Sequence, residues 1–107
     1  MALTRYHNIA GATQPTVELL APGDGVSSIN SILIANTHSS NAATVTIFLQ
    51  KNSTNETFKM INLVSVPSST SLLLDDSSML SFNNSIKAFG LYVTVGASDT
   101  VDVLINV

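Results

Sequence analysis

Few residues of this 107-residue chain could do chemistry, because it has two histidines, seven acids and no cysteine. Hydrolysis by a serine nucleophile needs a general base and an orienting acid that converge in space. The bases on offer are His7, near the start of the chain, and His38, in a polar loop, and no Gly-x-Ser-x-Gly elbow is present. We therefore expect surface or turn histidines, no catalytic residue and no enzyme activity.

A metal site would have to involve Asp75 and Asp76, the only adjacent acids. Neighbouring residues of an extended chain point to opposite sides, so their oxygens do not automatically converge on one ion. The acid spacing of a calcium-binding loop is absent, and no phosphate-binding glycine motif or lysine follows Gly23 and Gly25. We expect no metal site and no cofactor, and we interpret the pair as solvated acids that end a strand. Ion binding by Asp75 and Asp76 stays open.

The charge and hydropathy of the chain exclude further classes of partner. Charged residues make up 10% of the chain, the net charge is −3, and there is no basic run that could neutralise phosphates. No stretch approaches 18 consecutive apolar residues, which a membrane-spanning helix requires. The first residues lack the apolar core of a secretory signal. We expect no nucleic acid or membrane partner and a product made, at least at first, in a cytosol.

The elements that must position these residues are strands. Apolar residues make up 45% of the chain, and short apolar runs alternate with Ser, Thr and Asn, which suit turns and solvent-facing strand positions. Turn clusters recur at the spacing expected of a sandwich or barrel. We predict an all-β fold, an antiparallel two-sheet sandwich of the jelly-roll or immunoglobulin-like kind with seven or eight strands. Residues 1–15 are expected to be an N-terminal arm or edge segment, and residues 16–107 a single domain.

Individual strands can be placed by their alternation and by the turns that end them. In the segment 57–66 the apolar parity changes between Phe58 and Ile61, which predicts a bulge. In the segment 27–37 apolar residues fall on both parities, which indicates a bulge or burial on both faces. The predicted strands cover residues 16–21, 27–37, 44–51, 57–66, 71–74, 79–82, 86–95 and 101–107.

The last two predicted strands, 86–95 and 101–107, flank the small residues 96–100 and are expected to pair as a hairpin. A five-residue loop puts eight apolar side chains on one face, whereas a slip of one residue would bury Asp102. The expected partners are Val95 with Val101, Val93 with Val103, Leu91 with Ile105, and Phe89 with Val107.

That register also predicts an interaction surface. Tyr92 and Leu104 would lie directly opposite each other on the face away from the apolar row. Phe48 and Leu73 likewise have the opposite parity to their apolar neighbours. Large apolar side chains on the outer face of a sandwich point to a partner, although coverage by another part of the same chain is an equal alternative.

Several segments share one style of strand and turn. They are Val66-Pro67-Ser68-Ser69-Thr70-Ser71-Leu72-Leu73-Leu74-Asp75, the segments 79–82 and 86–103, and Ser31-Ile32-Leu33-Ile34-Ala35-Asn36-Thr37 before the Thr/Val strand at 43–49. In these segments the chain resembles small virion proteins of tailed bacteriophages. The resemblance covers about residues 26–107 and includes no catalytic motif.

The resemblance implies a non-enzymatic structural protein of the virion, present in many copies. Its expected role is a capsid decoration or cement protein that assembles through an apolar outer sheet face and the N-terminal arm. Its expected partners are other copies of itself and other virion proteins, above all the major capsid protein. A tail, neck or fibre component is one alternative, and a glycan- or receptor-binding module is another.

Overall fold

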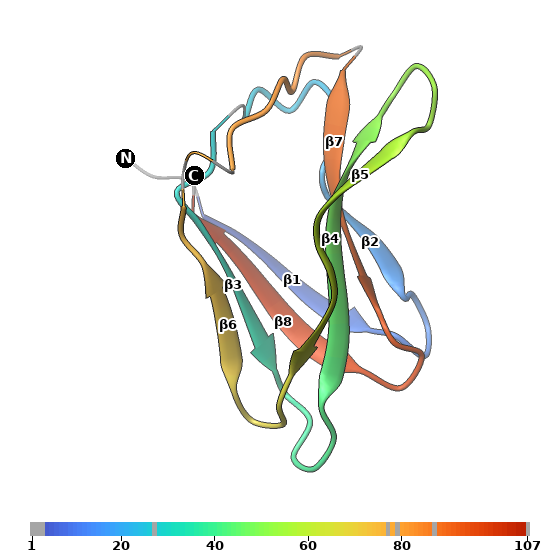
Figure 1. Cartoon of the computed structure of the whole chain (residues 1–107), viewed down its shortest axis with the longest axis vertical. Helices are drawn as coiled ribbons and strands as arrows, with labels where there is room; N and C mark the ends of the chain where they lie inside the picture. The colour runs from blue at the N-terminus through green and yellow to red at the C-terminus, as the bar shows by residue number, and fades with distance from the viewer. Residues whose placement is uncertain (1–3, 27, 77, 79, 87, 107) are drawn as a thin grey trace.

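The chain folds into two facing antiparallel sheets of four strands each (Figure 1). The computed structural model describes residues 4–26, 28–76, 78, 80–86 and 88–106. Among these residues no helix is long and apolar enough to cross a membrane. The strands are β1 (Thr4–Ala10), β2 (Thr16–Leu20), β3 (Ser31–Asn36), β4 (Ala43–Lys51), β5 (Thr57–Val66), β6 (Ser71–Leu74), β7 (Phe89–Val95) and β8 (Thr100–Asn106).

The order of the strands identifies the sandwich as a jelly roll. One sheet has the order β1-β8-β3-β6 and the other has the order β2-β7-β4-β5. Among consecutive strands only β4 and β5 pair directly, and every other connection crosses from one sheet to the other. Eight strands that alternate between two four-stranded sheets in this way make the double-sheet jelly roll, so the predicted two-sheet sandwich is confirmed.

The core lies between the sheets and is built by the period of two. β3 and β8 both alternate between half-buried and fully buried side chains, so one side of each strand faces inward. Inward-facing leucine, isoleucine and valine side chains from both sheets close the core without a disulfide. The largest fully buried side chains are Leu20, Ile29, Ile32, Ile34, Ile47, Leu80, Leu91 and Ile105.

The predicted pairing of the last two strands is wrong. β7 pairs with β2 and β4, whereas β8 pairs with β1 and β3, so the two strands belong to different sheets. The inward-facing residues Val93 and Val103 are both fully buried, so the parity was read correctly. The inward-facing apolar side chains of β7 and those of β8 are buried in the core between the sheets. This arrangement needs the same alternation of apolar and polar residues as a hairpin.

Three further predictions concern single segments. The bulge expected in 57–66 is confirmed, because the register of β5 against β4 shifts between the pairs Val45–Val64 and Ile47–Ile61. In the segment 27–37 the strand β3 begins only at Ser31, and its side chains alternate regularly between half-buried and buried. Ile29, ahead of the strand, is also buried. The strand predicted over 79–82 is not formed by its described residues, where Ser81 makes only an isolated bridge to Ser28; residue 79 lies outside the described residues.

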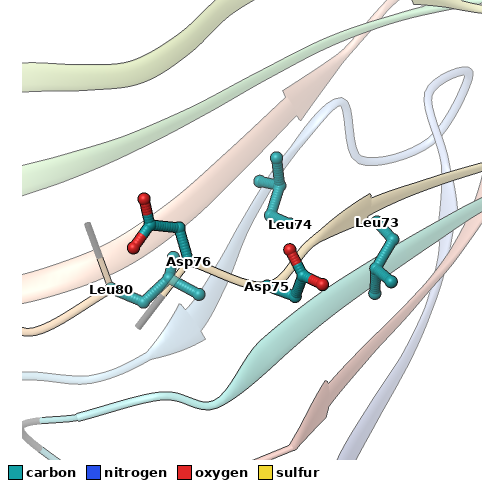
Figure 2. A pocket seen from close by; sticks show the side chains of 5 residues that line it. All are labelled: Leu73, Leu74, Asp75, Asp76 and Leu80. Atoms are coloured by element: carbon teal, nitrogen blue, oxygen red, sulfur yellow. The ribbon is translucent and has the colours of Figure 1, made fainter. Parts of the chain in front are cut away.

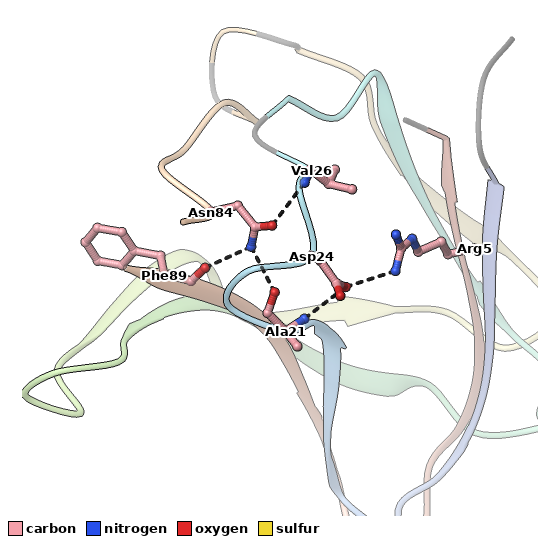
Figure 3. A network of polar contacts seen from close by, with 6 residues as sticks. All are labelled: Arg5, Ala21, Asp24, Val26, Asn84 and Phe89. Carbon is pink, nitrogen blue, oxygen red and sulfur yellow. Dashed lines mark hydrogen bonds and ion pairs between the residues drawn. The ribbon is translucent and has the colours of Figure 1, made fainter. Parts of the chain in front are cut away.

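The start of the chain is part of the sandwich. Thr4–Ala10, which lie in the segment expected to be an arm or an edge, form β1 and pair with β8 along the whole strand. Arg5 on this strand donates to Asp24 Oδ2 at 2.9 Å, in the connection between β2 and β3 (Figure 3). The two pairings hold β1 against both β8 and the β2–β3 connection.

A buried asparagine joins two connections at one end of the molecule. The Val26 N–H donates to Asn84 Oδ1, and Asn84 Nδ2 donates to the carbonyl oxygens of Ala21 and Phe89, each at 3.0 Å (Figure 3). Because a buried amide without partners is destabilising, these bonds fix the β2–β3 connection against the start of β7.

Candidate functional site

The two histidines have structural surroundings. His38 Nδ1 accepts from the backbone N–H groups of Ser40 and Asn41, both at 3.1 Å, in the loop after β3. His7 lies on β1, half-buried, and its Nε2 has no hydrogen-bond partner among the described residues. Among the described residues no hydrogen bond or ion pair joins either ring to a carboxylate, so the geometry does not build a nucleophile–base–acid set there.

The acidic pair ends β6, as the sequence suggests. Asp75 and Asp76 are both exposed, and Asp76 Oδ1 accepts from the Ser78 N–H at 3.1 Å and from its hydroxyl at 2.6 Å. Figure 2 shows the pair beside Leu73, Leu74 and Leu80, where they line a small pocket. Across the described residues no three His, Asp or Glu side chains lie close enough together to hold a metal ion.

The outer face of the β1-β8-β3-β6 sheet carries an apolar row that runs across all four strands. The register pairs Tyr6 with Leu104, Leu104 with Leu33, and Leu33 with Leu73. Directly paired side chains on one face lie about 5 Å apart at their Cβ atoms, so the four form one continuous surface. Tyr6 is 71% exposed and Leu73 is 53% exposed, and they stand at its two ends. We call this surface the apolar row.

Charge is almost absent around the apolar row. The neighbouring outward positions carry Asn8 and Asp102, whose side chains are hydrogen-bonded to each other at 2.6 Å, and the small residues Ala35 and Ser71. Asp102 is the only charged residue at the described outward positions of these four strands. Depletion of charge around large apolar side chains is the composition of an interface core.

The outer face of the other sheet has a row of different character. Here the register pairs Glu18 with Tyr92, Tyr92 with Phe48, and Phe48 with Lys59. The rings of Phe48 and Tyr92 are stacked, with centroids 5.5 Å apart and planes 10° apart. The Tyr92 hydroxyl donates to Glu18 Oε2 at 2.7 Å, so this row is apolar in the middle and charged at both ends.

The hydrogen bond to Glu18 changes the acidity of Tyr92. It raises the pKa of Tyr92 to about 12, with further contributions from burial and from repulsion by the Glu18 charge. Each of these effects favours the protonated phenol. Tyr92 therefore keeps its proton, and its bond to Glu18, throughout the neutral range.

The four interface residues predicted from the sequence lie on the two opposite outer faces. Leu104 and Leu73 belong to the apolar row, and Tyr92 and Phe48 to the other sheet. The expected juxtaposition of Tyr92 with Leu104 is wrong, because their strands are in different sheets. All four side chains point away from the core. Tyr92 and Leu104 each lie between two buried residues of their strand. Phe48 follows the buried Ile47, and Leu73 lies between Leu72 and Leu74, which are half-buried and pack against the core.

The sequence reading missed Tyr6 and Leu33 as members of the apolar row. Tyr6 lies in a segment with weak alternation, and Leu33 stands between Ile32 and Ile34, so neither has a clear parity signal. Leu33 could have been found by noting that a strand with three consecutive large apolar residues must turn one of them outward. Tyr6 could not, because only the pairing of β1 with β8 places it beside Leu104.

Comparisons with known proteins bear on the fold. No protein-family model matches the chain, and no curated protein matches it by sequence. A chain in a structure titled cyanophage Pam1 capsid asymmetric unit is 14% identical, with a TM-score of 0.51 over 98% of this chain and 82% of that chain. This likeness supports the jelly-roll fold.

Two structures of infectious bursal disease virus also match. The Gt strain structure is 11% identical with a TM-score of 0.44, and the Gx strain structure is 14% identical with a TM-score of 0.42. The match to the Gt strain structure covers 100% of this chain and 33% of that chain, and the match to the Gx strain structure covers 98% and 32%. This chain therefore spans only about a third of the length of each.

Proposed function

We propose that this chain is a non-enzymatic structural protein of a virion, and that it decorates a capsid by docking through the apolar row. The observation that carries the proposal is the continuous run of Tyr6, Leu104, Leu33 and Leu73 across a sheet face that is otherwise nearly uncharged. A monomeric sandwich normally covers its outer faces with polar groups. The fold is consistent with this role, because a chain of the cyanophage Pam1 capsid asymmetric unit shares it.

The size of the docking face favours use in many copies. Four strands of four to seven residues, about 20 Å long on average and spaced about 4.8 Å apart, give a face of roughly 400 Å². A stable interface between two proteins buries about 800 Å² on each partner. A single copy docked by this face alone would therefore bind weakly, and copies that also touch their neighbours on a particle would bind cooperatively.

Purified virus particles test the proposal. Particles from cultures of the organism that carries the gene are banded on a density gradient, and the chain is quantified against the major capsid protein by mass spectrometry. We expect it in copy numbers comparable to the major capsid protein. We also expect mild denaturant to release it while the shell stays closed in electron micrographs. Absence from the particles contradicts a virion role, and a few copies per particle indicate a tail, neck or fibre component instead.

Variants of the apolar row test the docking face. The double substitution Leu33→Ser and Leu104→Ser should lower rebinding to stripped particles at least tenfold, because it removes the centre of the row. The matched control is Ser31→Ala, an outward position of the same strand outside the row. Rebinding of the double variant at the wild-type level, with melting unchanged, would show that the particle is contacted elsewhere.

A further inference from the structure

A groove on the other outer face has the shape and chemistry of a receptor for a short segment. It lies over β4 and β5 and has a volume of about 390 Å³. The Phe48 ring and the Leu63 side chain both line it. Lys59 pairs with Phe48 across the two strands and lies four residues before Leu63 on β5. The remaining lining residues are Thr46, Thr57, Asn62 and Thr94.

Leu63 is held outward in this groove by its backbone. Its φ is +53°, in the left-handed region that leucine rarely adopts, and its N–H donates to Thr46 Oγ1 at 2.9 Å. The side chain is 69% exposed, so it gains little burial within the chain in return for this conformation. Strained residues that persist at a surface often mark an interaction site.

Lys59 gives the groove an uncompensated positive charge. The one ion pair among the described residues joins Arg5 to Asp24, at a different part of the molecule. Lys59 is exposed and follows Phe58 on β5, directly across from Phe48. The groove therefore fits an apolar side chain that has a carboxylate close by.

The chain itself carries such a segment at the end of β6. Leu73 is 53% exposed on the outer face of the opposite sheet, and Asp75 and Asp76 follow within a few residues (Figure 2). Leu73 and Asp75 are two residues apart, about 7 Å in an extended chain, which is close to the separation of about 7–8 Å between diagonal neighbours on paired strands. The two surfaces are complementary in charge, and each presents a large exposed apolar side chain, Leu63 in the groove and Leu73 in the segment.

We propose that the groove over β4 and β5 receives the Leu73–Asp76 segment of a second copy of this chain. Leu73 of one copy packs between Phe48 and Leu63 of the next, and its carboxylates face Lys59. The contact is heterologous, because the groove and the segment lie on different sheets, so each copy receives one neighbour and docks into another. A symmetric contact between two Leu73–Asp76 segments would instead bring four carboxylates together. The inference rests on the proposed function and deepens it. Leu73, at one end of the apolar row, makes the copy-to-copy contact, and Tyr6, Leu104 and Leu33 dock on the capsid.

Sedimentation of the purified chain tests this contact without any particle. Since each contact is small, we expect the weight-average mass to rise with concentration from about 10 µM to about 1 mM. Lys59→Glu and the double variant Asp75→Lys, Asp76→Lys should each remain monomeric over this range. Lys51→Glu, which removes a basic side chain outside the groove, should assemble like the wild type.

Charge exchange makes the test specific. An equimolar mixture of Lys59→Glu with the Asp75→Lys, Asp76→Lys variant should recover assembly, because each variant restores the complement that the other lacks. The triple variant with all three changes should assemble alone. A wild-type chain that is monomeric at about 1 mM, or a Lys59→Glu chain that assembles normally, overturns the proposal. The proposal is also overturned if the two variants are folded but their equimolar mixture does not assemble.

The outcomes separate this inference from the proposed function. If the wild-type chain stays monomeric but is abundant on particles, the copy-to-copy contact is wrong and the virion role stands. If the chain assembles in solution by charge exchange but is absent from particles, the contact stands and the virion role is wrong.

Discussion

At the scale of single residues, burial and hydrogen bonding set what each side chain can do. Tyr92 shows this, because stacking on Phe48 at 5.5 Å and donation to Glu18 at 2.7 Å leave its hydroxyl with one fixed partner. The resulting pKa of about 12 is above the ordinary tyrosine value of 10. The folded chain thus holds this proton more tightly than the unfolded chain does.

A spectrophotometric titration checks the Tyr92 contact. A group whose pKa is raised on folding contributes stability below its unfolded pKa and loses it as the pH rises through its folded pKa. We expect the contribution of Tyr92 to be complete below pH 10 and to disappear between pH 10 and about 12. In Glu18→Gln the Tyr92 midpoint should move down toward 10, and Tyr6→Phe serves to assign the signal to Tyr92. An unchanged midpoint in Glu18→Gln would show that the hydrogen bond does not control this pKa.

At the scale of elements, alternation predicts which side of a strand faces the core, but it does not predict the neighbouring strand. Val93 and Val103 were placed inward correctly, yet their strands lie in facing sheets and not side by side. A hairpin and a crossing connection bury the same side chains, so the residue pattern is identical in both. The bulge in β5 was predictable, because it changes the parity within one strand. The outward position of Leu33 could be read from its run of three apolar residues, whereas Tyr6 joined the apolar row only through a pairing that spans most of the chain.

Engineered disulfides distinguish the two pairings of β8. Asn8 and Asp102 are register partners on β1 and β8, and their side chains already touch at 2.6 Å. Paired positions of an antiparallel ladder meet the geometry of a disulfide. The variant Asn8→Cys, Asp102→Cys should lose its free thiols on mild oxidation as a monomer, and no native cysteine interferes. The variant Tyr92→Cys, Leu104→Cys, which a hairpin would bring together, should keep both thiols.

At the scale of the whole molecule, one core joins the two sheets and no cross-link supports it. Small domains of this kind have a free energy of unfolding of about 5–15 kcal/mol and unfold as a unit. A single charge placed in the core should therefore affect both sheets together, although it lies on one strand.

Val93→Asp tests this cooperativity. Val93 is fully buried on β7, and an unpaired buried carboxylate costs several kcal/mol, which approaches the whole stability of a small domain. We expect circular dichroism to show loss of the sheet signal at 25 °C, with amide exchange lost in β3 and β8 as well as in β7. The control is Ser65→Asp, at an exposed position of β5, which should melt within a few degrees of the wild type. Persistent protection in β3 and β8 of Val93→Asp would mean that the two sheets unfold independently.

The place of β8 between β1 and β3 has a consequence for biosynthesis. This strand follows all the others in the chain, so the first sheet lacks a central member until residues 100–106 leave the ribosome. Contacts between strands so distant in sequence form slowly, and unpaired apolar strands are prone to aggregation while they wait. We expect nascent chains to remain open, and to engage chaperones, until residues 100–106 have left the ribosome.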